Sequence, residues 1–248
     1  MKNGRVIGLG LESSCDETSA AIVMEGEVIL SNMINSQIEL HSDYSGVVPE
    51  IASRAHLENI NSLIDSALSE SGADFADLDY VAATNRPGLI GSLLIALQSA
   101  KAISFTLGIP LIAVNHLEAH LYAPFLEGNK LEYPFMGLVV SGGNTALYRI
   151  TAPGEMFLIG KTVDDAVGEA FDKVAKFYGF GYPGGVAIDR LAKNGNPKAA
   201  RFPMPMIDKQ HRDGVAANKA VVDLAANVAA HRYDVSYSGL KTAAINQI

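Results

Sequence analysis

The pattern that most constrains the fold is a succession of strands and turns that occurs twice along the chain. The first copy has apolar runs at 6–11, at 19–24 and from 28 onward, separated by the turns ESSCDET and EGE. The second copy has apolar runs at 135–140, 146–150 and 156–159, separated by the turns SGGNT and TAPGE. Short apolar runs broken by polar or glycine-containing turns are typical of a β-meander. The repeat therefore predicts two related lobes with a ligand between them.

Helical patterns follow each meander. After the first come an amphipathic helix at 49–71 and an apolar helix at 89–107, with strands at 80–84 and 111–115. After the second comes a helix at 164–178. Alternating strands and helices predict an α/β fold. We expect a first lobe at 1–130 and a second at 131–248, with the apolar helix packed in the core of its lobe.

Two histidines, His116 and His120 in VNHLEAHLYAP, directly follow the strand at 111–115. Four residues apart on a helix, their imidazoles lie on one face and could bind a metal ion. Metalloprotease chemistry is disfavoured, because the H-E-x-x-H signature needs a Glu next to the first histidine, whereas Glu118 lies two residues on. The pair is equally compatible with two half-buried rings that donate to carbonyls. A metal would need a third ligand from elsewhere, such as a carboxylate.

Glycine-rich turns are the candidates for binding phosphate. The backbone N–H groups of Ser141, Gly142 and Gly143 could approach a phosphate closely, although such triplets also form ordinary hairpin turns. The matching loop of the first lobe offers hydroxyls and carboxylates, at Ser13, Ser14, Asp16, Glu17 and Thr18. The segment NRPGLIGS suits either a tight strand-to-helix turn or an anion held at the helix N-terminus.

Two aspartates near a further glycine bend are candidates for binding ribose. Asp172 is predicted on a helix, and Asp189 on the first turn of the helix that follows the bend YPGG. Carboxylates in such positions could hold ribose hydroxyls. They could equally be helix-capping and surface charges, so both interpretations stay open.

Composition limits the partners. A net charge of −8 argues against a surface that binds nucleic acid unaided, so any basic patch must be local. Its candidates, which fit a solvated helix face equally well, are Lys173, Lys176, Arg190, Lys193, Lys198 and Arg201. The single cysteine, Cys15, and the absence of an apolar run long enough to span a bilayer predict a cytoplasmic protein without membrane contact.

Seven motifs together resemble the tRNA N6-adenosine threonylcarbamoyltransferase family. They are ESSCDET, GVVPEIASRAH, RPGLIGSL, NHLEAHLYAP, VSGGNT, DDAVGEAFDKVAKFYGFGYPGG and SYSGLKTA. They occur in the family's order and cover almost the whole chain. The resemblance implies the α/β fold of the actin-like ATPase (sugar kinase and chaperone) superfamily. Each lobe, 1–130 and 131–248, would then hold a ribonuclease-H-like mixed sheet.

The resemblance implies an acyltransferase, N6-L-threonylcarbamoyladenine synthase. It would move the threonylcarbamoyl group of threonylcarbamoyl-AMP to N6 of the adenosine beside the anticodon, at tRNA position 37, in tRNAs reading codons that begin with A. His116 and His120 would bind one Fe(2+) ion per subunit, or zinc. The ATP/AMP moiety of the substrate would lie against Val139, Val140, Ser141, Gly142, Gly143, Asp172, Gly185 and Asp189. No catalytic residue is assigned beyond these metal and substrate ligands.

The resemblance also implies partners and marks departures. The partners are tRNA and, in the bacterial complex, a degenerate paralogue subunit and a small ATPase subunit. The family's remaining metal ligand, an Asp, and an Asn near the nucleotide follow SGLKT by many residues, so we expect them beyond Ile248 and the chain to be C-terminally truncated. Asn144 stands where many bacterial members carry His. The alanine-rich insert 207–233 is predicted to be helical, without an assigned function. The other histidines, His41, His56, His211 and His231, are predicted to be surface or structural residues.

Two other functions stay open. The twin phosphate loops also fit an ATPase or kinase of the same superfamily, although such kinases have no use for two histidines at this spacing. A non-catalytic scaffold subunit of the same tRNA-modifying complex is favoured by the missing C-terminal ligands and disfavoured by the retention of His116 and His120.

Overall fold

The structure is a computed structural model that describes residues 4–44, 46–128, 130–205 and 233–247. It divides into two compact units, Met1–Lys130 and Leu131–Ile248, which are described separately. The predicted helical insert 207–233 lies outside the described residues except for Tyr233. His211 and His231 also lie outside them.

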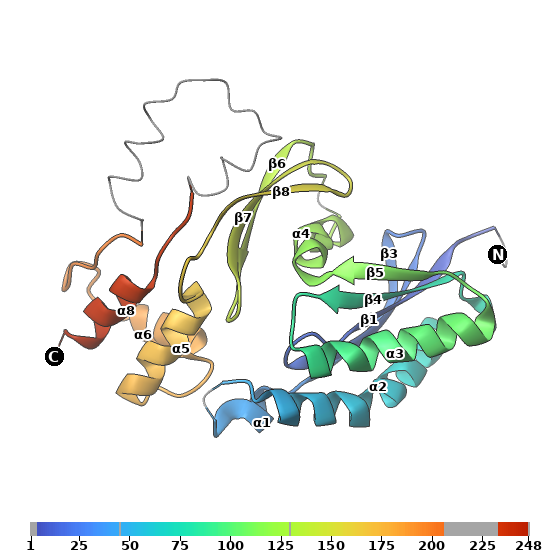
Figure 1. Cartoon of the computed structure of the whole chain (residues 1–248), viewed down its shortest axis with the longest axis horizontal. Coiled ribbons are helices and arrows are strands. Elements are labelled where there is room, and N and C mark those ends of the chain that lie inside the picture. The colour runs from blue at the N-terminus through green and yellow to red at the C-terminus, as the bar shows by residue number, and fades with distance from the viewer. Residues whose placement is uncertain (1–3, 45, 129, 206–232, 248) are drawn as a thin grey trace. The chain divides into compact units, whose positions relative to one another are not determined.

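The first unit contains a five-stranded mixed sheet with the strand order β3-β2-β1-β4-β5 (Figure 1). The strands are β1 (Ile7–Glu12), β2 (Glu17–Met24), β3 (Val28–Ser36), β4 (Tyr80–Arg86) and β5 (Leu111–Asn115). The first three strands form an antiparallel meander, and β4 and β5 continue the sheet parallel to β1. This is the order and direction of a ribonuclease-H-like sheet. The predicted α/β fold class is therefore confirmed.

Two long helices pack on this sheet. The helices of the unit are α1 (Ile38–Ser42), α2 (Pro49–Ser71), α3 (Ile90–Leu107) and α4 (His116–Leu126), with a short 3₁₀ helix η1 (Phe75–Asp77). Helix α2 packs against β2, β3 and α3, and helix α3 packs against β4 and β1. Their apolar faces enclose a core with Leu9, Ile22, Ile60 and Val81. Burial of such side chains stabilises the unit by roughly 1.5–3 kcal/mol each. The sequence did not predict α1.

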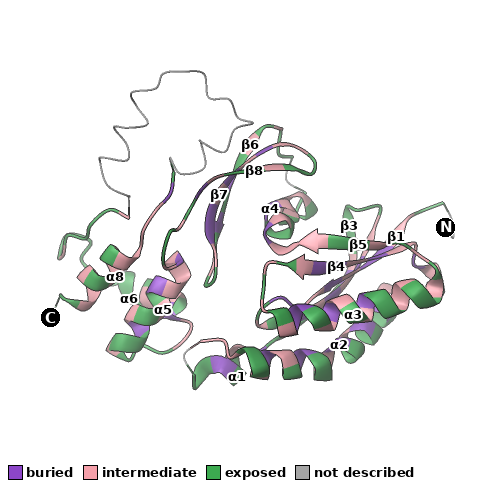
Figure 2. Ribbon diagram, viewed as in Figure 1, coloured by how far each residue is buried: buried purple, intermediate pink, exposed green. Residues whose placement is uncertain are grey.

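Helix α3 is more apolar than the sequence analysis expected of any segment of this chain. By length and composition it is able to span a membrane, so the expectation that no apolar run is long enough was wrong. Core helices pass the same test, and Ala96 and Ala100 of α3 belong to the core of the first unit, as predicted. Its other face is exposed at Ile90, Leu94 and Phe105 (Figure 2).

The described part of the second unit contains a three-stranded antiparallel sheet with the order β6-β7-β8. Its elements are β6 (Phe135–Val140), β7 (Thr145–Ala152), β8 (Glu155–Lys161), α5 (Val167–Tyr178), α6 (Gly184–Ala192) and α8 (Ser238–Ile245). The strands form the predicted meander. Helix α5 begins at Val167 instead of residue 164, because Asp164 and Asp165 lie in the preceding loop and bond to other elements.

Candidate functional site

Polar side chains gather at the carboxyl edge of the parallel strands in the first unit. The parallel register of β1 and β4 places Glu12, the last residue of β1, beside Thr84. Strand β5 ends at Asn115, whose side chain accepts the N–H of Leu117 at 2.9 Å and so caps the N-terminus of α4. Helix α4 carries the two predicted metal ligands. This edge is the usual place for ligand sites in α/β sheets.

The two histidines on α4 face each other through their Nε2 atoms. His120 Nε2 lies 3.2 Å from His116 Nε2, and the ring planes are inclined at 79°. Two nitrogens at this separation can both lie about 2.1 Å from one ion, so the pair fits part of a metal site. Within the described ranges, no group of three or more His, Cys, Asp or Glu side chains could hold a metal. The structure therefore brings two candidate ligands together and adds no third from the part of the chain that it describes.

The surroundings of this pair favour a neutral His120 and place carboxylates nearby that a bound cation would neutralise. Burial and the nearby His116 ring lower the pKa of His120, which favours the neutral ring that metals bind. Burial and the neighbouring Asp16 and Glu12 raise the pKa of Glu17, as expected where several carboxylates lie close together. A cation would relieve this repulsion. The thiol of Cys15 has a pKa raised to about 12, by burial and by Asp16, and is therefore protonated at neutral pH.

Glu12 is a residue of this site that the sequence analysis missed. Its Oε2 lies 3.3 Å from His116 Nδ1, and it accepts hydrogen bonds from the hydroxyl of Thr84 and the backbone N–H of Ser14. Burial raises the pKa of Glu12, but hydrogen bonds from His116, Ser14 and Thr84 outweigh burial and hold the pKa at about 2. Its sequence signals were its place at the end of an apolar strand and its position as the first residue of the motif ESSCDET.

A buried histidine on α2 anchors the loop after β1 through hydrogen bonds. His56 is fully buried, and its Nε2 lies 3.1 Å from the carbonyl oxygen of Cys15. Its Nδ1 accepts the hydroxyl of Thr18 at 2.7 Å and the amide of Gln37 at 3.1 Å. His41 bonds to the same Gln37 at 3.3 Å. His41 and His56 are therefore structural, one of the two predicted roles.

Helix α3 anchors the same loop from its N-terminal end. The hydroxyl of Ser13 donates to the carbonyl of Ser92 at 2.6 Å and accepts the N–H of Ala96 at 3.1 Å. A Cβ at Gly88 would lie 2.6 Å from the carbonyl oxygen of Ser14. This close approach of two backbone segments supports the tight-turn interpretation of NRPGLIGS.

In the second unit, the predicted phosphate loop is a tight turn between β6 and β7. Ser141 N–H donates to the carbonyl of Asn144 at 2.8 Å, and Ser141 Oγ accepts the N–H of Asn144 at 3.0 Å. A Cβ at Gly142 or Gly143 would have no heavy atom within 4 Å. Packing therefore does not require either glycine, and both leave open space in which a ligand could approach the backbone.

Helix α5 begins against this turn. Gly168 N–H donates to the carbonyl of Ser141 at 3.3 Å, and a Cβ at Gly168 would lie 2.6 Å from that oxygen. One turn later, Asp172 Oδ1 accepts the N–H of Gly184 at 2.7 Å, at the first residue of α6. Asp172 thus joins α5 to α6, and Gly185 follows directly. The prediction that Asp172 and Gly185 bind substrate stays a prediction.

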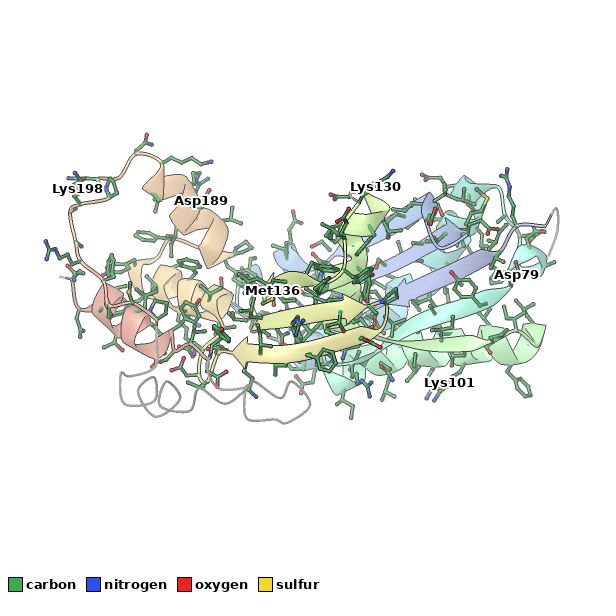
Figure 3. The ribbon with its side chains drawn as sticks, turned by 90° about the horizontal axis from the view of Figure 1, so that it is seen from above. Asp79, Lys101, Lys130, Met136, Asp189 and Lys198 are labelled. Atoms are coloured by element: carbon green, nitrogen blue, oxygen red, sulfur yellow. The ribbon has the colours of Figure 1, made fainter. Side chains whose placement is uncertain are left out.

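Asp189 does not lie where the sequence predicted it. Because α6 begins at Gly184, Asp189 is beyond the first turn, so that placement was wrong. Figure 3 labels Asp189 on α6. Its exposed carboxylate lies 3.6 Å from Lys193. A role for Asp189 toward ribose stays a prediction, as do the roles of Val139 and Val140 at the end of β6.

Part of the predicted basic patch is already paired. Lys173 Nζ lies 2.6 Å from Asp165 and 2.8 Å from Glu169. Together with the contact between Lys193 and Asp189, these ion pairs neutralise two of the six candidates. The patch as a whole stays a prediction.

The topology of the first unit and the two facing imidazoles define an α/β protein with a ribonuclease-H-like sheet and a candidate metal-binding pair at its carboxyl edge. Comparison with known proteins is more specific. The sequence profile of the tRNA N6-adenosine threonylcarbamoyltransferase family matches residues 28–248. The chain belongs to this family.

Curated relatives carry the same name. The protein of Treponema denticola is 53% identical over 240 residues, which are 97% of this chain and 65% of that protein. The protein of Clostridioides difficile is 44% identical over 243 residues, which are 98% of this chain and 66% of that protein. The chain thus spans slightly less than two thirds of the length of these relatives. Among solved structures, YeaZ from Pseudomonas aeruginosa is 21% identical, with a TM-score of 0.42 over 62% of this chain and 64% of that chain.

Proposed function

We propose that this protein transfers the threonylcarbamoyl group of threonylcarbamoyl-AMP to N6 of adenosine 37 in tRNAs reading codons that begin with A. The observation that carries the proposal is the match to relatives named tRNA N6-adenosine threonylcarbamoyltransferase, 44% to 53% identical over nearly the whole chain. The facing imidazoles of His116 and His120 support it, since both ligands predicted for the metal lie together.

The proposed reaction is a direct acyl transfer. The adenosine amine attacks the carbamoyl carbon and a C–N bond forms. The bond from that carbon to the phosphate oxygen breaks, AMP leaves with the electron pair, and the amine loses a proton. No covalent enzyme intermediate is needed, which agrees with the protonated thiol of Cys15.

The residues have separate proposed roles. His116 and His120 would hold one Fe(2+) ion, or zinc, which when bound polarises oxygen atoms of the substrate. The backbone N–H groups of Gly142 and Gly143 would bind the leaving phosphate, because both residues are exposed and a Cβ on either would meet no heavy atom within 4 Å. Asp172, Gly185 and Asp189 would line the remainder of the adenylate site.

The proposed setting follows from the family. We propose a cytoplasmic protein that acts on tRNA, with the degenerate paralogue and the small ATPase as partner subunits. A net charge of −8 supports the need for partners, because 27 acidic residues outnumber the 19 Lys and Arg residues and would repel the phosphates of a tRNA.

The test is a nucleoside analysis of tRNA from cells depleted of this protein. We expect the threonylcarbamoyl modification of adenosine to disappear, and to return when the chain is supplied again. His116→Ala should restore it at least about tenfold less well, since it removes a metal ligand. The matched control is Glu118→Gln on the same helix, which should restore it fully.

Other outcomes separate the alternatives. Unchanged modification after depletion contradicts the proposal. Full restoration by His116→Ala would instead support the scaffold subunit, the alternative favoured by the two-ligand set in the described residues.

A further inference from the structure

The ring of His116 has two nitrogens with different surroundings. Nε2 faces His120 Nε2 at 3.2 Å, while Nδ1 faces Glu12 Oε2 at 3.3 Å and Ser14 Oγ at 3.0 Å. A neutral imidazole carries a proton on one nitrogen and a lone pair on the other. What lies at Nδ1 therefore decides what Nε2 presents to a metal.

The carboxylate of Glu12 is held in place from two sides. The hydroxyl of Thr84 donates to Oε2, and the backbone N–H of Ser14 donates to Oε1. Thr84 is buried, and the Glu12 side chain is only 27% exposed. Since both oxygens already accept hydrogen bonds, the group acts as an acceptor toward the ring of His116.

An acceptor at Nδ1 selects one tautomer. With the proton on Nδ1, the ring donates to Glu12, and Nε2 turns its lone pair toward His120. With the proton on Nε2, a lone pair on Nδ1 would face the carboxylate oxygen, which is repulsive. The hydroxyl of Ser14 can either donate or accept, so it does not select a tautomer.

We propose that Glu12 is a positioning residue that fixes His116 as the Nδ1–H tautomer and directs the Nε2 lone pair toward the metal position shared with His120. Carboxylates beyond a metal-bound histidine commonly have this role. The selection of the tautomer is a property of the protein alone. Its consequence for metal binding rests on the proposed function.

The geometry explains why these residues lie where they do. Glu12, Thr84 and His116 stand at the carboxyl ends of three adjacent parallel strands, β1, β4 and β5. The register of the sheet therefore sets the distance between the carboxylate and the ring. Thr84 belongs to the same hydrogen-bond network, because its hydroxyl donates to Glu12 Oε2, the oxygen that faces His116 Nδ1.

The test uses the full chain and two readouts. The first is ring ¹⁵N NMR of the metal-free protein, in which wild-type His116 is expected as the Nδ1–H form. Glu12→Gln should yield a mixture of tautomers, because an amide can turn either a donor or an acceptor toward Nδ1. The second is anaerobic titration with Fe(2+), in which the affinity of Glu12→Gln should fall about 10- to 100-fold.

Two further variants complete the design. Thr84→Val keeps the side-chain volume but frees one carboxylate oxygen, so it should shift the tautomer in the same direction by a smaller amount. It carries the test if Glu12→Gln does not fold. Glu118→Gln, on the helix of the histidines, should change neither readout.

The outcomes distinguish this proposal from the proposed function. An unchanged tautomer of His116 in Glu12→Gln and in Thr84→Val overturns the positioning role, whether or not the protein binds iron. A shifted tautomer together with no iron binding by the wild-type protein supports the positioning role and contradicts the metal site of the proposed function. A shifted tautomer and weakened iron binding support both.

Discussion

At the scale of single residues, His56 shows how a buried ring can direct a loop. Its pKa is lowered because burial penalises the charged imidazolium, and the bond to the Cys15 carbonyl offsets this only in part. With Nε2 donating to that carbonyl, Nδ1 must accept from Thr18 and Gln37. A proton on Nδ1 would turn this acceptor into a donor facing the Gln37 amide. The network thus requires neutral His56.

The first prediction concerns pH. His56 has a folded-state pKa below its ordinary value of 6.5, so the unfolded chain binds more protons near that pH. Its contribution to stability is complete above pH 6.5 and is lost as the pH falls through 6.5 toward the lower folded-state pKa. Urea unfolding of wild type and His56→Gln at pH 7.5 and 5.5 measures it. The wild type should lose more stability between these pH values than the variant does.

The same variant has an expected cost at neutral pH. Replacing His56 leaves Thr18 or Gln37 without its present acceptor, which should lower the free energy of unfolding by about 1–3 kcal/mol. Equal losses between the two pH values in both proteins would show that His56 does not cause the pH dependence.

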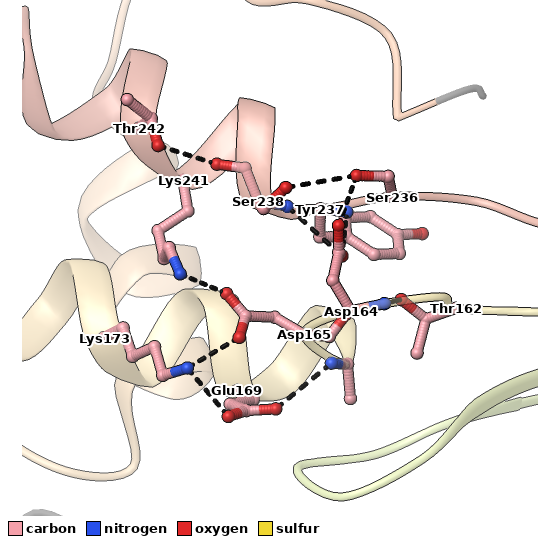
Figure 4. Close-up of polar contacts among 11 residues, drawn as sticks. Thr162, Asp164, Asp165, Glu169, Lys173, Ser236, Tyr237, Ser238, Lys241 and Thr242 are labelled. Carbon is pink, nitrogen blue, oxygen red and sulfur yellow. Dashed lines mark hydrogen bonds and ion pairs between the residues drawn. The ribbon is translucent and has the colours of Figure 1, made fainter. Parts of the chain in front are cut away.

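At the scale of elements, two acidic residues before α5 hold α8 in place (Figure 4). Asp164 accepts the backbone N–H groups of Tyr237 at 2.8 Å and Ser238 at 3.3 Å, at the N-terminus of α8. Asp165 lies between Lys173 on α5, at 2.6 Å, and Lys241 on α8, at 2.5 Å. The motifs DDAVGEAFDK and SYSGLKTA are therefore joined by charge, which their separation in sequence does not reveal.

The second prediction tests this junction. Asp165→Asn should lower the free energy of unfolding by about 1–3 kcal/mol, because two lysines lose a carboxylate that is only 12% exposed. The matched control is Asp189→Asn, which removes a carboxylate 75% exposed beside Lys193 and should change stability by less than about 0.5 kcal/mol. Chemical denaturation of both variants provides the comparison, and similar losses would argue against a role for the Asp165 junction.

Most elements were predictable because their signals are local. The bounds of α2 match the prediction, and α3 differs by one residue, since apolar spacing and flanking glycines mark helix ends. The start of α5 and the position of Asp189 were wrong. Both depend on which residues bond to distant elements, and local periodicity carries no information about that.

At the scale of the whole molecule, the core of the first unit is self-contained. All residues of its buried cluster lie between Leu9 and Ala100, within that unit. The third prediction is that residues 1–130 expressed alone fold cooperatively, with the amides of β1 and β4 protected from hydrogen exchange. A spectrum without dispersed amide signals would contradict it. Ile22→Ala, at a fully buried position, should destabilise this fragment by about 2–5 kcal/mol.

The sequence by itself determined the two meanders, the main helices, the histidine spacing on α4 and, through its ordered motifs, the family. These are short-range patterns, and they persist in almost any tertiary context. Only the tertiary structure decided what surrounds His116. Glu12 is separated from Thr84 by 72 positions and from His116 by 104, so their contact exists only once β1, β4 and β5 align in parallel register. Hydrogen bonds act over about 3 Å, and only the folded sheet brings these groups within that range.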